Sequence, residues 1–241
     1  EALKVTSGTT TLEGGNFTYK KPIRVSERAK LVVNNTNINV DDEPGINTID
    51  GTVIVNGGEI HSENKSAIDS TRSSTTINGG NISSKEEVAV NCVGFSVNVT
   101  DGHVYSEKTH AVTVTEAAAT VSGGKLESAT ASGLYIGSST VAATSLKVSG
   151  GEFIGKTYGI HSHGTNTTAE ISGGTMIGEI YGINDTAKKE TISNAYIEGG
   201  INGINHTDGS LTMTGGTAVG KTQYGLYSTS NLTLGKQDRN V

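Results

Sequence analysis

The sequence is short of several residue types, and each shortage excludes a class of protein. Its 241 residues include no tryptophan, two prolines and a single cysteine. One cysteine cannot form an internal disulfide, which excludes a small scaffold held together by disulfides. No basic residue lies close to Cys92 in the sequence, so we predict a small buried apolar residue there rather than a reactive thiol.

Basic charge and long apolar runs are also missing. Lys and Arg number 18 against 24 Asp and Glu, and the net charge of −6 argues against nucleic-acid binding through a basic face. No apolar run approaches the length of a membrane span, so no membrane insertion is predicted. Neither end has the pattern of a signal peptide or an anchor, and neither supplies a capping element. We therefore expect a fragment of a longer surface protein whose adjacent domains adjoin this one.

Glycine is abundant, with 33 residues, and it recurs in a repeated frame. The frame is an apolar residue, a polar residue, Gly-Gly or a substitute, a variable residue and an apolar residue. The steps between copies are 21 to 23 residues, except for one step of 27 residues. The first position of each Gly pair is Gly14, Asn35, Gly57, Gly79, Asp101, Gly123, Gly150, Gly173, Asn194 and Gly215.

Three columns of this repeat are apolar in every copy. They lie two residues before the first position of the Gly pair, three residues after it, and ten or eleven residues after it. The last column consists of Val25, Ile46, Ile68, Val90, Val112, Leu134, Ile160, Ile183, Ile204 and Leu226. Apolar and polar residues alternate around these positions, which is the periodicity of short strands. One coil cannot bury its own apolar faces, so the copies must stack.

The sequence therefore predicts one all-β domain over residues 1–241, a three-sided parallel β-helix of about ten coils. The handedness rule for parallel crossovers favours a right-handed winding. The step of 27 residues predicts a loop that bulges from one corner, within residues 135–148.

The repeats "SGGTMIGEIYGI" and "TGGTAVGKTQYGLY" resemble non-catalytic, glycan-binding β-helix segments of Gram-positive bacterial surface adhesins, in the pectate-lyase-like superfamily. The resemblance covers residues 12–234. It implies an extracellular or cell wall-attached adhesin segment that binds a polysaccharide or host glycan. The same superfamily includes polysaccharide lyases and glycoside hydrolases, which are the alternative class.

The resemblance to the enzymes extends only to fragments of their sites. "HSHGT" contains the His163-Gly164 pair of the galacturonan hydrolases, but no Arg-x-Lys element follows it. In the repeat, His161 and His163 share columns with Asn and Thr, which indicates turn residues. Asp185 and His206 are expected to touch across neighbouring coils as an exposed pair of little energetic weight. We predict no catalytic residue and no cofactor.

An acidic turn raises the question of calcium, because carboxylates and turn carbonyls are its ligands. Lysines interleave with these acids, so a solvated mixed-charge edge is favoured and a calcium ion is left as an alternative. The acids are Asp41, Asp42, Glu43, Glu63, Glu86, Glu87 and Glu107, and the lysines are Lys65, Lys85 and Lys108.

Tyrosine is concentrated after residue 130. Tyr158, Tyr181 and Tyr224 each precede a small corner residue, in a slot that holds Ser66, His110, Ser132 and Asn202 in other coils. The slot is predicted to face outward, so these three rings are the candidate ligand-binding residues and could stack on sugars. The alternative is that the rings only pack on the sheet.

Two further alternatives are a structural spacer and an ice-binding surface. Thr-x-polar rows at 76–78, 120–122, 191–193 and 212–214 suggest an ice-binding array, but Asn98, Lys147 and Glu170 interrupt it. The polar column beside the Gly pair is better explained as a ladder that bonds coil to coil.

Overall fold

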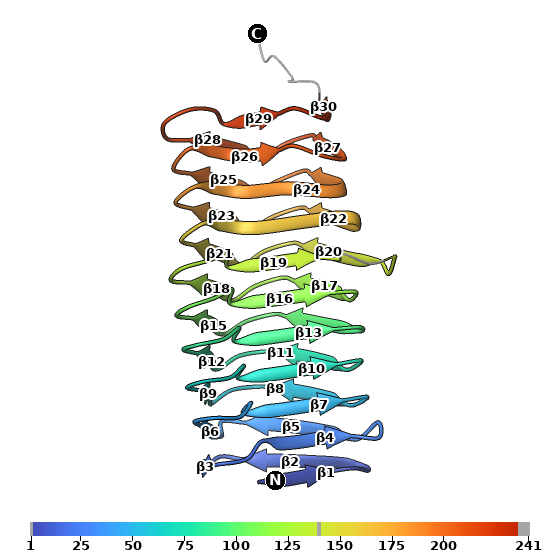
Figure 1. Ribbon diagram of the computed structural model, residues 1–241, viewed down its shortest axis with the longest axis vertical. Coiled ribbons are helices and arrows are strands. Elements are labelled where there is room, and N and C mark those ends of the chain that lie inside the picture. The colour runs from blue at the N-terminus through green and yellow to red at the C-terminus, as the bar shows by residue number, and fades with distance from the viewer. Residues whose placement is uncertain (1, 139–140, 236–241) are drawn as a thin grey trace.

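The computed structural model describes residues 2–138 and 141–235, and the chain forms a parallel β-solenoid of about ten coils (Figure 1). Each coil contributes strands in three successive positions, and each strand pairs in parallel with the equivalent strand of the next coil. Over these residues there is no helix, and so no helix that could span a membrane. The predicted class and coil number are confirmed; the right-handed winding and the three-sided section stay predictions.

Strands in the first position of a coil are β1 (Leu3–Val5), β4 (Ile23–Ser26), β7 (Ile46–Ile49), β10 (Ile68–Thr71), β13 (Val90–Val93), β16 (Val112–Thr115), β19 (Leu134–Gly137), β26 (Asn202–His206) and β29 (Leu226–Ser228). Those in the second position are β2 (Thr9–Glu13), β5 (Lys30–Asn34), β8 (Thr52–Val55), β11 (Ser74–Ile77), β14 (Ser96–Val99), β17 (Ala118–Val121), β20 (Thr144–Val148), β27 (Ser210–Met213) and β30 (Asn231–Leu234). The long strands β22 (Tyr158–Ile171) and β24 (Tyr181–Ile192) span both positions, which joins these strands into one sheet. The second sheet contains the third-position strands β3 (Asn16–Tyr19), β6 (Asn37–Val40), β9 (Glu59–Ser62), β12 (Asn81–Ser84), β15 (His103–Ser106), β18 (Lys125–Ser128), β21 (Glu152–Gly155), β23 (Thr175–Gly178), β25 (Tyr196–Gly199) and β28 (Thr217–Gly220).

The predicted register is confirmed in all three apolar columns with one correction. In the first coil, Ile23 rather than Val25 pairs with Ile46, and Val25 pairs with Thr48. The error arose because Ile23 and Val25 are two residues apart and both point inward, so periodicity alone fits either of them. The longer step places its additional residues between β19 and β20; residues 139–140 lie outside the described part of the chain.

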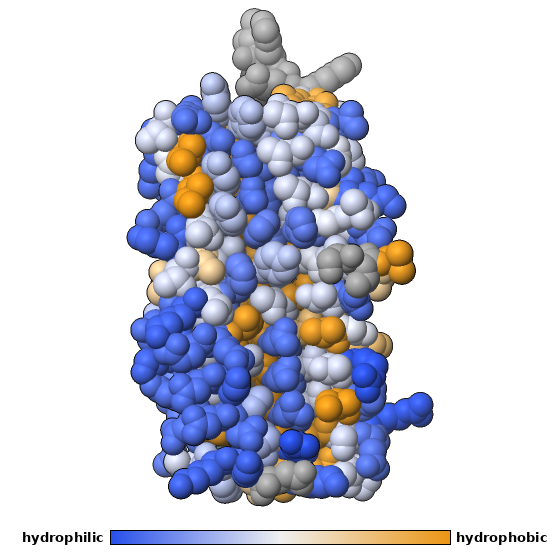
Figure 2. Space-filling model, viewed as in Figure 1, coloured by the Kyte–Doolittle hydropathy of each residue, from blue (hydrophilic) through white to orange (hydrophobic). Residues whose placement is uncertain are grey.

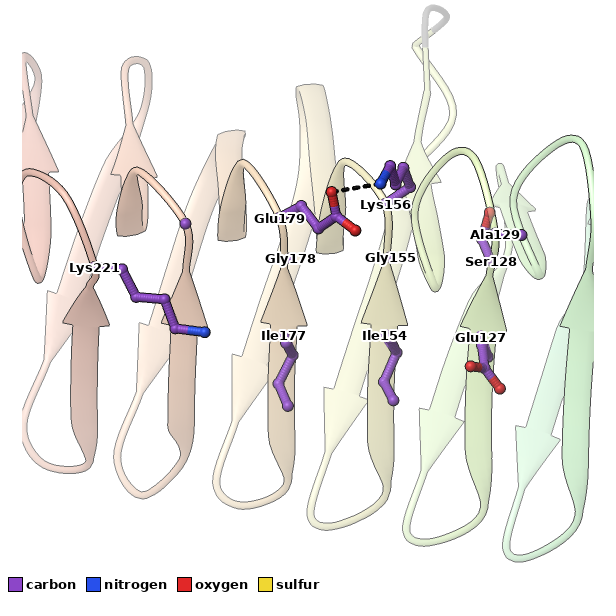
Figure 3. Close-up of a pocket in the computed structure, with 11 residues that line it drawn as sticks. Glu127, Ser128, Ala129, Ile154, Gly155, Lys156, Ile177, Gly178, Glu179 and Lys221 are labelled. Carbon is purple, nitrogen blue, oxygen red and sulfur yellow. Dashed lines mark ion pairs between the residues drawn. The ribbon is translucent and has the colours of Figure 1, made fainter.

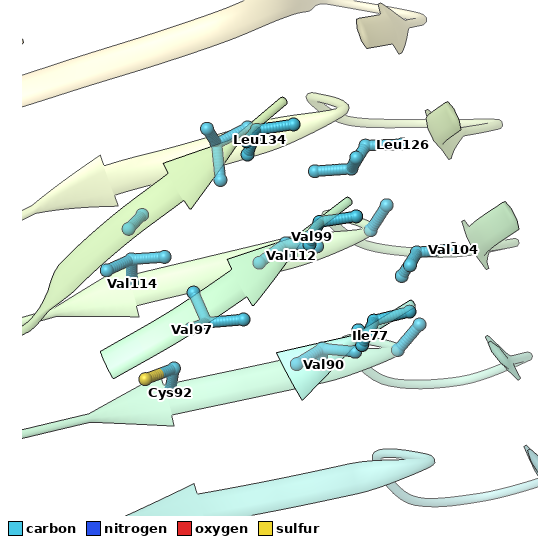
Figure 4. Close-up of a cluster of buried hydrophobic side chains, with 14 of the residues drawn as sticks. Ile77, Val90, Cys92, Val97, Val99, Val104, Val112, Val114, Leu126 and Leu134 are labelled. Atoms are coloured by element: carbon cyan, nitrogen blue, oxygen red, sulfur yellow. The ribbon is translucent and has the colours of Figure 1, made fainter. Parts of the chain in front are cut away.

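The core is a continuous column of Ile, Val, Leu and Ala side chains inside the coils (Figure 4). Like residues lie above like residues, so each coil covers the apolar side chains that its neighbour cannot cover. Cys92 lies within this column, fully buried beside Val97 and Val114 (Figure 4). Its burial confirms the prediction of a small buried residue at this position, and the same burial raises the pKa of the thiol to about 11.

Outside the core, polar ladders follow the coils. The predicted ladder beside the Gly pairs is present: the amide of Asn56 donates to Asn34 at 2.8 Å, and Asn78 donates to Asn56 at 2.8 Å. At the acidic turns, Lys65 pairs with Glu87 at 2.7 Å, and other lysines pair with acids one coil below. Figure 2 shows a nearly continuous hydrophilic surface over the corners that follow β6, β9, β12 and β15. Among the residues described, no group of His, Cys, Asp or Glu has the geometry to hold a metal ion.

We expect Ile82→Asp and Ile171→Asp each to lower the free energy of unfolding by more than about 4 kcal/mol, because each places an unpaired charge at a position with no exposed surface. Chemical denaturation measures the loss. The matched controls are Asn81→Asp and Ser172→Asp, which put the same charge on the adjacent exposed position. An equal effect of the inward and outward substitutions would contradict the register.

Candidate functional site

The corner between the third strand of one coil and the first strand of the next changes type along the solenoid. In the coils that contain β9, β12, β15 and β18, which lie toward the N-terminus and are called the lower coils, a serine occupies this corner. Its hydroxyl donates a hydrogen bond to the backbone of the preceding coil. Ser84 Oγ donates to Lys65 O at 2.7 Å, and Ser106 Oγ donates to Glu87 O at 2.8 Å. In the upper coils the same position is Gly155, Gly178, Gly199 or Gly220.

The glycine corners are tighter, because the chain folds back onto the strand that follows. A Cβ atom at Gly155 would lie 1.9 Å from Tyr158 O, and one at Gly178 would lie 1.8 Å from Tyr181 O. No residue larger than glycine fits such an approach. The sequence showed only that these positions are small; the structure shows that they allow Tyr158 and Tyr181 to begin β22 and β24 directly at the corner.

An aromatic cluster lies on the outer surface beside these corners; it consists of His110, Tyr135, Tyr158, His161 and Tyr181. Tyr158 and Tyr181 are stacked across neighbouring coils, with ring centroids 5.5 Å apart and planes within 3° of parallel. The His161 ring meets Tyr158 edge-on at 5.1 Å and Tyr135 at 5.2 Å. His110 continues the contacts to Tyr135 at 5.1 Å.

Sequence analysis did not identify His110 and His161 as members of the site, since His161 shares its column with Asn residues and was interpreted as an interchangeable turn residue. The alignment of the repeats nevertheless indicates the aromatic contacts. Tyr135 and His161 pair directly in the register of β19 and β22, and His110 occupies the same slot as Tyr158. Rings in neighbouring coils are about 4.8 Å apart along the stack, so aligned aromatic residues must touch.

Tyr224 lies apart from the aromatic cluster. Asn202 separates it from Tyr181 in the column, and the Asn202 side chain is only 3% exposed. Its Oδ1 accepts a hydrogen bond of 3.1 Å from the Tyr224 backbone N–H. Tyr224 stacks instead on Tyr227, with centroids 5.9 Å apart. The predicted column of three tyrosines is therefore a pair within the aromatic cluster and a separate pair in the last coil.

The aromatic cluster is electrically neutral near pH 7. Burial, together with the nearby His163 and His110, lowers the pKa of His161 to about 4. Burial also lowers the pKa of His110, whose Nδ1 accepts a hydrogen bond from the Ser132 backbone N–H at 3.2 Å. Both imidazoles are therefore uncharged, and the cluster presents ring edges, one tyrosine face and polar tips to the solvent.

A groove of about 640 Å³ lies on the other side of the same corners, over the outer face of β18, β21 and β23 (Figure 3). Its floor contains Ile154 and Ile177, which are neighbours in the register and point outward. Lys156 and Glu179 form an ion pair of 2.6 Å along the corner. Tight glycine corners thus border both the groove and the aromatic cluster.

Hydrogen bonds stabilise the ionised form of two carboxylates beside the groove, those of Glu127 and Glu198. Although partial burial opposes the shift, hydrogen bonds from Lys125 and His103 lower the pKa of Glu127. Glu198 follows Ile177 in the same outward column, and hydrogen bonds from Lys221 and Tyr196 lower its pKa. These acids carry fixed charge and can accept hydrogen bonds, but they hold no proton to donate at neutral pH.

The exposed Asp185–His206 pair predicted from the sequence is wrong in its location. The two side chains do touch, with Nδ1 2.7 Å from Oδ2, but both are fully buried inside the coils. They form a polar cluster with Ser162 and Glu190, which are also fully buried. His163 lies outside this cluster, where its Nδ1 is 2.9 Å from Thr186 Oγ1. No polymer can reach the buried groups while the coils are intact.

No protein-family model matches the chain, and comparisons with curated proteins and with solved structures find no significant match.

We expect Gly178→Ala to lower the free energy of unfolding by about 2 kcal/mol or more, because the new methyl group meets a backbone carbonyl that cannot move without breaking the coil. Denaturant titration measures the change. The matched control is Gly8→Ala, where no atom lies within 4 Å and only the positive φ of 64° is unfavourable, at about 1 kcal/mol. Equal losses for the two variants would contradict the role given to the glycine corner.

NMR titration of the histidine rings should give His161 a midpoint near pH 4. The unfolded chain takes up this proton near pH 6.5. The lowered pKa of His161 in the folded chain therefore contributes stability at neutral pH, and this stability is lost as the pH falls from about 6.5 to about 4. In His110→Asn most of the shift should persist, because burial is its largest cause. A His161 midpoint at the ordinary value would show that the ring is solvated.

Proposed function

We propose that this chain is the binding segment of an extracellular or cell wall-attached adhesin, and that it holds a polysaccharide or host glycan on the outer surface of its upper coils. The observation that carries the proposal is the aromatic cluster beside the groove, with one line of glycine corners between them. The resemblance to right-handed β-helix adhesins of the pectate-lyase-like superfamily supports the same assignment.

A glycan suits this surface because sugars have apolar ring faces bordered by hydroxyl groups. The outer face of the Tyr158–Tyr181 stack and the edges of His161 and Tyr135 offer apolar contact with polar tips. Across the corner, Ile154 and Ile177 provide an apolar floor, and ionised carboxylates and ammonium groups at its rim can bond hydroxyls. Because the contacts repeat from coil to coil, a long repetitive ligand can engage several of them together.

A lyase or hydrolase is the alternative, and two observations disfavour it. A glycosidase needs a carboxylic acid whose pKa is raised so that it can protonate the leaving group. The pKa of Glu127, in the groove, and that of Glu198, which follows Ile177 in the same outward column, are lowered instead. The buried Asp185 and His206 have no path to a polymer.

The ice-binding alternative is disfavoured by the register of the outward Thr column. Thr120 is followed by Lys147 and Glu170 before Thr191 resumes the row. Lys147 and Glu170 lie 3.8 Å apart and are largely exposed, so a charged pair stands in the middle of the array. A spacer role explains the stacked coils but requires neither the groove nor the aromatic cluster.

We expect the double variant Tyr158→Ala, Tyr181→Ala to bind glycans about fivefold to 150-fold more weakly, since each lost ring contact contributes about 0.5 to 1.5 kcal/mol. A glycan array identifies the ligand of the unmodified chain, and calorimetry with that glycan measures the loss. Thermal unfolding checks that the coils are intact, as expected for a slot that holds Ser132 and Asn202 in other coils.

Two further variants locate the site. Tyr19→Ala removes a ring from β3, in the first coil and far from the groove and the aromatic cluster, and should leave binding unchanged. Tyr224→Ala removes a ring of the separate pair and should have a smaller effect than the double variant. Full binding by a folded double variant would overturn the proposed site, and turnover of a polysaccharide by the unmodified chain would favour the enzyme.

A further inference from the structure

The buried polar cluster of Ser162, Asp185, Glu190 and His206 brings carboxyl and imidazole groups into an interior whose other buried polar side chains, among the residues described, are mainly serines and threonines. The four residues come from the neighbouring strands β22, β24 and β26, and none has exposed surface. Ser162 Oγ is 2.7 Å from Glu190 Oε2 and 3.3 Å from Asp185 Oδ1. Below Ser162, the column of Asp185 continues with Ile136, Val114 and Cys92 and then with the neutral Ser70 and Thr48, so its one carboxylate lies in the upper coils.

The hydrogen-bond partners of His206 determine its charge. Its Nδ1 is 2.7 Å from Asp185 Oδ2 and its Nε2 is 3.2 Å from the backbone carbonyl of Asn231. A carboxylate and a carbonyl can only accept, so both ring nitrogens must donate and the imidazole is protonated. Asp185 is then its counter-ion, and it also accepts a hydrogen bond of 2.9 Å from the Ala187 backbone N–H.

Glu190 is left without a counter-ion. Ser162 has one hydroxyl hydrogen and cannot donate to both carboxylates. A neutral Glu190 resolves the conflict, because its O–H donates to Ser162 and Ser162 donates to Asp185. Among the buried side-chain N and O atoms of residues 2–138 and 141–235, Glu190 Oε1 alone has no hydrogen-bond partner, as expected of the carbonyl oxygen of an acid with no cation beside it.

The surroundings offer nothing to neutralise a second carboxylate. Glu190 stands between Ala169 and Leu211 in its column, and the third strands contribute the buried apolar Met176 and Ile197. Asp208, exposed after β26, adds negative potential at His206. The adjacent Lys188 and Lys189 are exposed, outside the coil.

We propose that this buried cluster is an acid-stabilised latch that binds β22, β24 and β26 together, and that these coils open more readily as the pH rises and the cluster loses a proton. The latch lies directly under the aromatic cluster: Ser162 follows His161 on β22, and Asp185 lies four residues after Tyr181 on β24. Opening of β24 therefore separates Tyr181 from Tyr158.

The direction of the pH effect is the same for both titrating groups. Burial and the charge of Asp185 raise the pKa of Glu190 well above its ordinary value, and the hydrogen bond to Asp185 raises that of His206. A raised pKa in the folded state means that stability is fully present below the pKa of the unfolded chain and declines as the pH rises through the folded value. His161 has the opposite sign, but its effect ends near pH 6.5.

Hydrogen exchange on the full chain, from about pH 5 to about pH 9, tests the latch. Amides of residues 181–213 are compared with those of residues 46–121, after correction for the pH dependence of chemical exchange. We expect the protection of the upper coils to fall relative to the lower coils by up to about tenfold per pH unit for each proton released. E190Q, which mimics the neutral acid, should remove the contribution of Glu190 and leave only that of His206.

E190L is the second variant, since leucine occupies the next position of the same column at Leu211. It should fold and should show the same reduced pH dependence even if E190Q does not fold. A ratio of protection that does not change with pH in the unmodified chain would overturn the latch. The same would follow if both variants retained the full pH dependence.

Discussion

The parallel hydrogen-bonded ladder between successive coils is the constraint on which the other features depend. It holds each residue about 4.8 Å from the equivalent residue above and below, so the side chain at a position in one coil must pack against the side chains at the same position in the neighbouring coils. Apolar residues stack into a core that no single coil could bury, and Asn and Thr residues stack into chains of hydrogen bonds. The same spacing is enough to bring the rings of Tyr158 and Tyr181 into contact.

The change from serine corners to glycine corners divides the surface into two regions. In the lower half, serine hydroxyls satisfy the turn backbone, and lysines alternate with glutamates along the edge. In the upper half, the corner is so tight that only glycine fits there. Tyr158 and Tyr181 can therefore begin their strands directly at the corner. The groove and the aromatic cluster both adjoin these corners, which places the candidate binding surface in the upper coils.

The same upper coils carry the buried polar cluster, and the two features share strands. Along β22 and β24, outward residues form the aromatic cluster and inward residues form the polar cluster, because successive side chains of a strand point to opposite faces. An interior with a paired charge and a neutral acid is less stable than a well-packed apolar one of the same size. The upper coils hold the buried carboxyl and imidazole groups on which the proposed response to pH rests, whereas the buried hydroxyls of Thr48, Ser70, Ser73 and Thr75 in the lower coils do not titrate.

The repeat by itself determined the strand class, the number of coils, the three apolar columns and the polar ladder, because a short period repeated ten times leaves one consistent way to bury the apolar residues. Only the tertiary structure decided where the charged residues lie. Asp185 is two residues after the buried Ile183, and Glu190 is two before the buried Ile192, so the alternation already placed both inside. That signal was overridden by the general rule that charges are exposed, a rule that fails when Ser162 and His206 supply partners across coils. Tyr224 illustrates the converse: its sequence position placed it in the right column, but the buried Asn202 lies between it and Tyr181, so the three rings do not form one stack.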